Sequence, residues 1–98
     1  MRPTTRDELL TLLRAHEAEM RARFGMRTLA LFGSFARDAA GPASDVDLLV
    51  EFDGEATFDR YMGLVEFLEE RLGRHVDLAT PGSLKPRVRP HVERDLVH

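Results

Sequence analysis

The sequence predicts an α/β fold, in which a small mixed sheet of about three or four strands carries helices packed on one face. Two stretches place apolar residues at helical spacing, residues 5–24 and 57–72. Three shorter stretches have the apolar runs or the alternation typical of strands, residues 28–32, 46–52 and 75–80. The helices would cover one face of the sheet, and the other face would stay open as a cleft.

Length and composition limit what such a chain can do. The 98 residues suffice for a single domain, 1–98, with one core and no room for a second substrate domain. The 14 basic and 17 acidic side chains give a formal charge of −3, so binding to a membrane, or to nucleic acid as a direct substrate, is not expected. The chain has no cysteine, which excludes disulfides and thiolate metal sites. No apolar run approaches the roughly 18 residues of a membrane span. Asp7 and Glu8 precede the first leucines, which does not suit a signal peptide, so we expect a cytoplasmic protein.

The first predicted helix begins with a capping box and ends at a glycine. Thr5 and Glu8 have the spacing at which each side chain bonds the other residue's backbone N–H. Gly25 follows the last apolar position, where helices commonly end. The inner face consists of residues at helical spacing, Leu9, Leu13, His16, Met20 and Phe24. We expect His16 on this face to be a packed or peripheral histidine and not a metal ligand.

The apolar stretch at residues 28–32 stops abruptly at Gly33 and Ser34. Glycine tolerates backbone angles that other residues avoid. Backbone N–H groups with no Cβ in the way, together with the Ser34 hydroxyl and the start of a helical turn, can cradle a phosphate. A glycine followed by a serine is, by itself, a weak indication of such a site.

Two aspartates lie within or directly before the strand predicted at residues 46–52. Because alternate residues of a strand share a face, Asp45 and Asp47 project opposite the apolar set Val46, Leu48, Val50 and Phe52. Alternate residues lie about 6 to 7 Å apart. Two carboxylates at that distance repel by about 2 to 3 kcal/mol at an effective dielectric constant near 20, and a divalent cation would remove the repulsion. Aspartate is depleted in strands, but a solvent-facing edge commonly carries carboxylates, so the pair alone is also compatible with a structural role.

The second long helix has a capping residue at each end. Thr57 can cap its first turn, and Gly73 stands where the helix should end. The expected core stripe is Phe58, Tyr61, Val65, Leu68 and Leu72. The expected solvated outer face is Arg60, Glu66, Glu69, Glu70 and Arg71, and we assign it no chemistry.

A third carboxylate lies in the strand predicted at residues 75–80. Val76 and Leu78 face one way along this strand, and Asp77 faces the other. If the strand pairs beside residues 46–52 and shares the same core, Asp77 joins the two earlier aspartates on their face. Taken alone, Asp77 would be interpreted as a surface aspartate.

The end of the chain is basic and interrupted by prolines. Pro90 suits the first turn of a short helix at residues 91–96. The basic side chains of this tail are Lys85, Arg87, Arg89 and Arg94. They could contact a triphosphate, a nucleic acid or a partner protein, or they could form only a solvated surface.

Together these features resemble the nucleotidyltransferase superfamily that includes DNA polymerase beta, and within it the minimal nucleotidyltransferase branch. The shared pattern is an apolar strand, Gly33 and Ser34, ten intervening residues and then Asp45 and Asp47 of an Asp-x-Asp. The resemblance extends over residues 29–84. It implies the nucleotidyltransferase fold, a mixed sheet with helices on one side.

Further positions agree with this branch, and one departs from it. Arg37 and Ser44 stand where the branch usually has these residues. Asp77, in the sequence LGRHVDL, matches the context of the third catalytic carboxylate in relatives. Asp38 stands where relatives usually have glycine. This departure concerns the shape of the loop and not the metal site.

The resemblance implies a catalytic role and a metal-binding role for each of the three carboxylates. Asp45 and Asp47 would share two Mg²⁺ ions, with Mn²⁺ as an alternative. Asp77 would bind the catalytic ion and help to take the proton of the acceptor.

The same resemblance implies ATP as substrate and four nucleotide-binding residues. Gly33 and Ser34 would hold the triphosphate, Arg37 would contact a phosphate or position the loop, and Ser44 completes the set.

The activity implied by the resemblance is transfer of AMP from ATP to a hydroxyl, with release of pyrophosphate. Minimal nucleotidyltransferases are commonly encoded beside a helical HEPN-domain partner and act as its antitoxin. A hydroxyl of a HEPN toxin is therefore the expected acceptor, within a homo- or hetero-oligomer. Two alternatives stay open: neutralisation of a HEPN partner by occlusion without catalysis, and nucleotide sensing without turnover. An enzyme requires all three carboxylates, whereas a pure binding module tolerates their loss.

Overall fold

The computed structural model describes residues 5–39, 41 and 44–83. Its elements, in chain order, are α1 (Arg6–Ala15), α2 (Glu17–Phe24), β1 (Met26–Phe32), α3 (Gly33–Ala36), β2 (Val46–Phe52), α4 (Phe58–Leu72), β3 (Val76–Ala79) and the 3₁₀ turn η1 (Pro81–Ser83). The basic tail and the helix expected at residues 91–96 lie outside the described residues. Among the described helices, none is long and apolar enough to cross a membrane.

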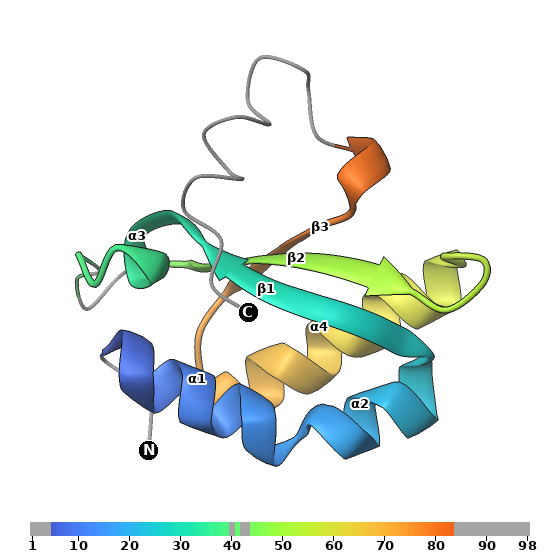
Figure 1. The fold of residues 1–98 in the computed structure, drawn as a ribbon, viewed down its shortest axis with the longest axis horizontal. Helices are drawn as coiled ribbons and strands as arrows, with labels where there is room; N and C mark the ends of the chain where they lie inside the picture. The colour runs from blue at the N-terminus through green and yellow to red at the C-terminus, as the bar shows by residue number, and fades with distance from the viewer. Residues whose placement is uncertain (1–4, 40, 42–43, 84–98) are drawn as a thin grey trace.

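The strands form one mixed sheet in the order β1-β2-β3. β1 runs antiparallel to β2, and β3 runs parallel to β2. α1, α2 and α4 lie on one face of the sheet, whereas α3 lies at the end where β1 finishes and β2 starts (Figure 1). The predicted α/β class, the mixed sheet and the helices on one face are confirmed, with three strands in the described part of the chain.

Strand β2 contributes its apolar side to the core, as the alternation predicts. Every second residue is buried, namely Val46, Leu48, Val50 and Phe52. Burying a valine or leucine side chain contributes roughly 1.5 to 3 kcal/mol. A shift of one residue would move this whole set to the open face, so burial fixes the register of β2 against its neighbours.

The N-terminal helix is not continuous, and the expectation of one helix through residues 5–24 is wrong. α1 starts with the predicted capping box at Thr5, but His16 has a φ of −107° and a ψ of 6°, and α2 begins after it. The His16 ring lies edge-on to Phe67 of α4, with ring centroids 5.8 Å apart, and Phe24 of α2 meets the same ring at 5.6 Å. The apolar positions keep their helical spacing across His16, so periodicity did not indicate the break.

Both ends of α4 agree with prediction, and its core stripe agrees except at Phe58. The Thr57 side chain accepts a hydrogen bond from Arg60 N, and Gly73 ends the helix with a φ of 64°. Phe58, assigned to the core stripe, is 76% exposed. The buried residues are Leu64, Phe67, Leu68 and Leu72. Leu68 and Leu72 are thus buried as predicted, and Tyr61 and Val65 pack partly buried against the core. The apolar face is wider than the predicted line, because it also includes Leu64 and Phe67.

Two charged residues of α4 assigned to a solvated face instead hold other segments. Glu69 Oε2 accepts a hydrogen bond from Val76 N at 3.0 Å and pairs with His75 Nδ1 at 2.9 Å. Arg60 Nη1 donates to Asp53 O at 2.8 Å. For these two residues the expectation of a purely solvated role is wrong, because each satisfies a backbone group of a neighbouring strand or loop.

Candidate active site

Three segments of the chain meet at the end of the sheet beside α3. Phe32, the last residue of β1, lies opposite Asp47 of β2, and Asp47 lies opposite Asp77 of β3. Residues in register on adjacent strands point to the same face at a spacing of about 4.8 Å. The predicted pairing of these strands is confirmed, so Asp47 and Asp77 lie side by side. Asp45 is exposed two residues before Asp47.

Gly33 allows the Asp47 carboxylate to lie against the first residue of α3. The φ of Gly33 is 76°, in the left-handed region that favours glycine. A Cβ built on Gly33 would overlap Asp47 Oδ2 and lie 3.0 Å from Asp47 Cγ. Both the backbone angle and the approach of the carboxylate therefore require glycine at this position.

Ser34 lies in the first turn of α3, directly after the strand, as the sequence predicts. The turn begins at Gly33, whose carbonyl accepts a hydrogen bond from Arg37 N at 3.2 Å. Ser34 is half-buried. Its position beside Gly33 suits the predicted phosphate cradle, and its binding role stays a prediction.

Burial and neighbouring charges both disfavour the ionised form of Asp47. Partial burial raises the pKa of Asp47 above its ordinary value, and repulsion from Asp77 and Asp45 raises it further. Arg37 acts in the opposite direction and lowers the pKa. The three predicted carboxylates are thus close enough to repel one another, and the surroundings of Asp47 favour the arrival of positive charge.

The donor set suits a hard divalent cation. Asp45, Asp47 and Asp77 offer carboxylate oxygens, which Mg²⁺ and Mn²⁺ prefer. Within the described residues, no three His, Cys, Asp or Glu side chains are already arranged around one cation position. Mg²⁺ commonly takes one or two protein carboxylates and completes its shell with water and substrate phosphates. The chemistry of the donors and the repulsion at Asp47 therefore fit a cation that binds together with a nucleotide.

The remaining two residues assigned to the nucleotide have different surroundings. Arg37 is exposed at the end of α3, and its charge acts on Asp47. Ser44 Oγ accepts a hydrogen bond from Gly41 N at 2.8 Å, and its carbonyl accepts one from Arg74 Nη1 at 3.2 Å. The Ser44 side chain thus shapes the loop before β2. Nucleotide binding by Arg37 and Ser44 stays a prediction.

Asp38 adopts the backbone conformation that a glycine would take at its position. Its φ of 56° is the only positive value among the described residues other than glycine. A left-handed conformation costs a residue with a Cβ about 1 to 2 kcal/mol, and aspartate tolerates it better than most. Aspartate can therefore hold a positive φ at this position at a modest cost.

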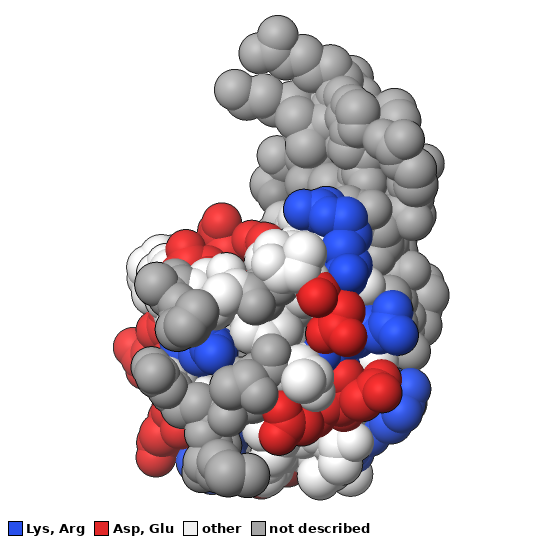
Figure 2. All heavy atoms as spheres, turned by 90° about the vertical axis from the view of Figure 1, so that its left-hand side faces the viewer, with Lys and Arg blue, Asp and Glu red and all other residues white. Residues whose placement is uncertain are grey.

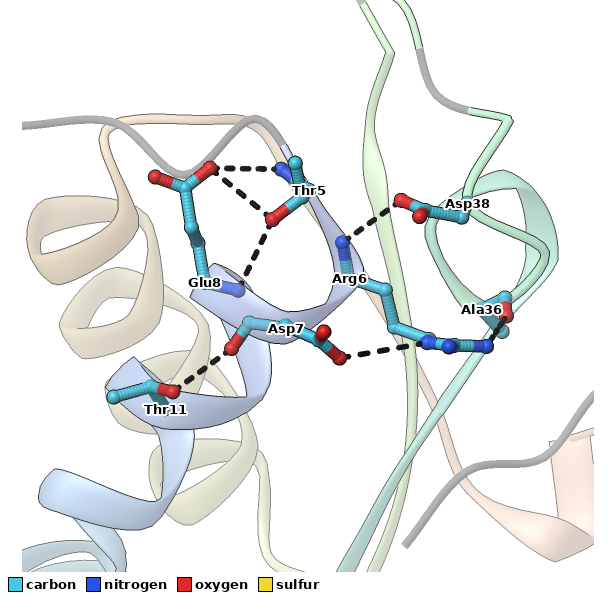
Figure 3. A network of polar contacts seen from close by, with 7 residues as sticks. All are labelled: Thr5, Arg6, Asp7, Glu8, Thr11, Ala36 and Asp38. Atoms are coloured by element: carbon cyan, nitrogen blue, oxygen red, sulfur yellow. Dashed lines mark hydrogen bonds and ion pairs between the residues drawn. The ribbon is translucent and has the colours of Figure 1, made fainter.

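A contact with the start of α1 accompanies this unusual conformation (Figure 3). Asp38 Oδ1 accepts a hydrogen bond from Arg6 N at 3.1 Å, and Arg6 Nη1 donates to Ala36 O at 3.3 Å. The two contacts bracket Arg37, which lies between Ala36 and Asp38 in the chain. A hydrogen bond contributes about 0.5 to 1.5 kcal/mol, which offsets much of the strain at Asp38. Sequence reasoning did not identify Arg6, although an aspartate at a glycine position was a signal that its side chain had a partner.

The face of the molecule at which α3 lies carries charges of both signs. Figure 2 shows acidic side chains gathered on this face, with basic side chains beside them. Such a mixture suits a metal-bound polyphosphate, because carboxylates bind the cation and basic groups bind the phosphates.

Comparison with known proteins gives a consistent family. Residues 13–97 match the family described as nucleotidyltransferase domain. The protein adenylyltransferase MntA of Thermococcus cleftensis is 40% identical over 94 residues, which cover 96% of this chain and 95% of the relative. A Methanocaldococcus jannaschii protein assigned as a protein adenylyltransferase is 38% identical over 97 residues, which cover 96% of this chain and 97% of that relative.

Solved structures agree in fold. One assigned as a minimal nucleotidyltransferase superposes with a TM-score of 0.76 at 38% identity, over 92% of this chain and 94% of the other. A toxin–antitoxin structure with AMP-PNP superposes with a TM-score of 0.66 at 21% identity, over 94% of this chain and 69% of the other. At that identity the second likeness concerns the fold alone.

Proposed function

Since this chain belongs to the nucleotidyltransferase domain family, we propose that it is a protein adenylyltransferase, which moves AMP from ATP to a hydroxyl of a partner protein. The observation that carries the proposal is the 40% identity, over almost the whole of both chains, to a relative named for this activity. Family membership confirms the nucleotidyltransferase expected from the sequence. The acceptor class and the residue roles are the proposed part.

The proposed reaction forms one bond at phosphorus and breaks another. The acceptor oxygen bonds to the α-phosphorus of ATP, the bond from that phosphorus to the oxygen of the β-phosphate breaks, and pyrophosphate leaves. We assign Asp45 and Asp47 to hold two Mg²⁺ ions, or Mn²⁺ as an alternative. Bound metal would stabilise the attacking and leaving oxygens. Asp77, exposed beside Asp47, is assigned a share in this binding and in taking the proton of the hydroxyl.

The segment at the start of α3 is assigned to the triphosphate. Backbone N–H groups at Gly33 and Ser34 lie where the strand turns into a helix, a position that suits phosphate oxygens. Arg37 adds a cation close enough to act on Asp47. Ser44 would complete the nucleotide site from the loop before β2.

We further propose that the partner is a toxin of the HEPN type and that this chain is its antitoxin, acting in the cytoplasm. Toxin–antitoxin complexes occur among the solved structures that share the fold, which supports the choice of a toxin. Positioning a second substrate contributes as much as about 7 to 11 kcal/mol to a bimolecular reaction. Residues 5–39, 41 and 44–83 form a single sheet with its helices, so we assign acceptor positioning to the surface of a docked partner.

Intact mass spectrometry tests the proposal directly. The purified partner is incubated with this protein, ATP and Mg²⁺, and we expect one or more additions of the mass of AMP. The additions should vanish with EDTA and with Asp47→Asn. The matched control is Glu51→Gln on the same strand, whose carboxylate pairs with Arg27 at 2.8 Å, and it should retain transfer.

Occlusion without catalysis remains the second candidate for the antitoxin effect. It predicts a complex in which the toxin is silenced with no change in mass, and in which Asp47→Asn silences it equally well. That outcome would overturn the transferase assignment for this acceptor.

A further inference from the structure

One cation is buried behind the candidate site. Among the described residues, Arg74 is the single charged residue that is buried, with 8% of its surface exposed. It follows Gly73 at the end of α4 and precedes β3, which carries Asp77. Burying a guanidinium is costly unless its N–H donors and its planar face find partners. The partners of Arg74 therefore indicate its structural role.

The guanidinium joins two other segments of the site. Arg74 Nη1 donates to the carbonyl of Ser44 at 3.2 Å, and Ser44 directly precedes Asp45. Arg74 Cζ lies 5.1 Å from the centroid of the Phe35 ring, and Phe35 directly follows Ser34. Phe35 is itself 1% exposed, which makes it a fixed platform within the core.

All three segments that carry the proposed catalytic and nucleotide-binding residues therefore meet at one side chain. Arginine is suited to this arrangement because its planar group can stack on a ring while its N–H groups bond in the plane. Lysine keeps the charge but loses the planar stack and the fixed direction of the donors.

We propose that Arg74 is a positioning residue for nucleotidyl transfer, which sets the α3 turn and the loop before β2 at their working separation. It acts on the reaction through Ser34 and Asp45, and it does not itself touch the reacting atoms. The effect on transfer rests on the function proposed above, whereas the effect on the two loops does not.

The test compares Arg74→Met and Arg74→Lys with Arg71→Met. Arg71 is a matched control, because it lies three residues earlier, in the last turn of α4. Its Cζ stacks 4.6 Å from the centroid of the Phe67 ring, and it pairs with Glu70, and both of these contacts lie outside the site. Backbone amide NMR spectra of each variant report on the loops without any substrate. Transfer to the partner, or pyrophosphate release, is then measured at saturating ATP on variants that give a folded spectrum.

We expect Arg74→Met to shift the amide resonances of the α3 turn and of Asp45, while the resonances of the turn at Gly54, which follows the other end of β2, stay in place. A misplacement of about 1 Å can cost on the order of 10²-fold in rate, so we expect kcat to fall by about 10- to 100-fold. Arg74→Lys should recover only part of this loss. Arg71→Met should stay within about twofold of wild type and leave both loops unshifted.

Unshifted amides in both loops of Arg74→Met, or a kcat within about twofold of wild type, overturn the proposal. If Arg74→Met does not fold, Arg74→Lys decides the matter by the same two measurements. If the wild-type protein transfers no AMP, the proposed function fails on that result, and the NMR comparison still decides whether Arg74 holds the two loops.

Discussion

The two faces of β2 differ in what they contribute, although they are made by the same seven residues. The face of Leu48 is buried against the helices, and the face of Asp47 is only partly buried and meets the carboxylate of Asp77. The apolar face stabilises the fold and sets the register. The other face holds a partly buried carboxylate that is repelled by Asp77 and Asp45, and this lowers stability. A cation-binding role would explain why such an arrangement is present. Stability and chemistry are therefore separable along this strand by substituting neighbouring residues.

The largest expected effect is on activity and concerns the Asp47 face. Asp47→Asn keeps the shape of the side chain and removes the charge that a metal ligand needs, so transfer should fall by about 10³-fold or more. The fold should be retained, because the apolar side of β2 is unchanged. Transfer rates measured beside those of Glu51→Gln check this, since both variants remove one carboxylate from the same face of β2. Wild-type turnover in Asp47→Asn would remove Asp47 from the reaction.

The buried face should show the largest effect on stability. Leu48 is fully buried, whereas the adjacent Leu49 is half-buried on the other face. Leu48→Ala should lower the free energy of unfolding by about 2 to 5 kcal/mol, and Leu49→Ala should lower it by clearly less. Urea denaturation of both variants measures the difference. Equal losses would mean that the two faces contribute equally to the core.

A substitution at Gly33 should affect both stability and activity, because its φ is positive and its backbone lies against the Asp47 carboxylate. Gly33→Ala should lower stability by about 1 to 3 kcal/mol through the strain at a positive φ, and it should also impair transfer by displacing Asp47. Gly54 is a suitable control, since its φ is 82° but the nearest atom to an added Cβ, Arg60 Nη1, is 4.0 Å away. Gly54→Ala should lower stability through the same backbone strain but retain transfer activity. Full activity in Gly33→Ala would show that the close approach of the carboxylate is dispensable.

Asp38 offers a smaller effect at the edge of the same site. Asp38→Ala keeps the strain at positive φ and loses the hydrogen bond to Arg6 N, so it should cost about 1 kcal/mol. Asp38→Gly loses the bond but removes the strain, so its stability should stay near that of wild type. Asn tolerates the left-handed conformation and retains an acceptor, so Asp38→Asn should change least. Thermal unfolding of the three variants checks the order, and a loss in Asp38→Gly as large as that in Asp38→Ala would contradict the strain argument.

The smallest expected effect is the pH dependence of stability that Asp47 brings to the metal-free protein. Its folded-state pKa is raised above the ordinary value of 3.8, so the folded state holds this proton more tightly than the unfolded state does. The tighter binding of this proton stabilises the folded state. This stabilisation is fully present below pH 3.8 and is lost as the pH rises through the raised pKa of Asp47. Asp47→Asn should therefore be the more stable protein at neutral pH, and the two proteins should converge in acid. The free energy of unfolding, measured at a series of pH values in EDTA, checks this. If Asp47→Asn stays more stable than wild type in acid, its greater stability has another cause.

Local signals in the sequence determined a large part of this structure. The capping residues Thr5 and Thr57, the helix end at Gly73, the alternation along residues 46–52 and the glycine at position 33 are all found as predicted. Each of these signals acts over a few residues, through a hydrogen bond or the pleat of a strand, so the neighbours in the chain suffice to specify it.

Tertiary structure decided the features that join distant segments. The contact of the His16 ring with Phe67, the burial of Leu64 and Phe67 in α4 and the contact of Asp38 with Arg6 depend on packing between elements far apart in the chain. The pairing of Asp77 with Asp47 and the burial of Arg74 likewise arise only when β3 lies beside β2. The sequence by itself determined which residues could form the site, and only the folded chain determined which of them lie together, because long-range burial has no local period along the sequence.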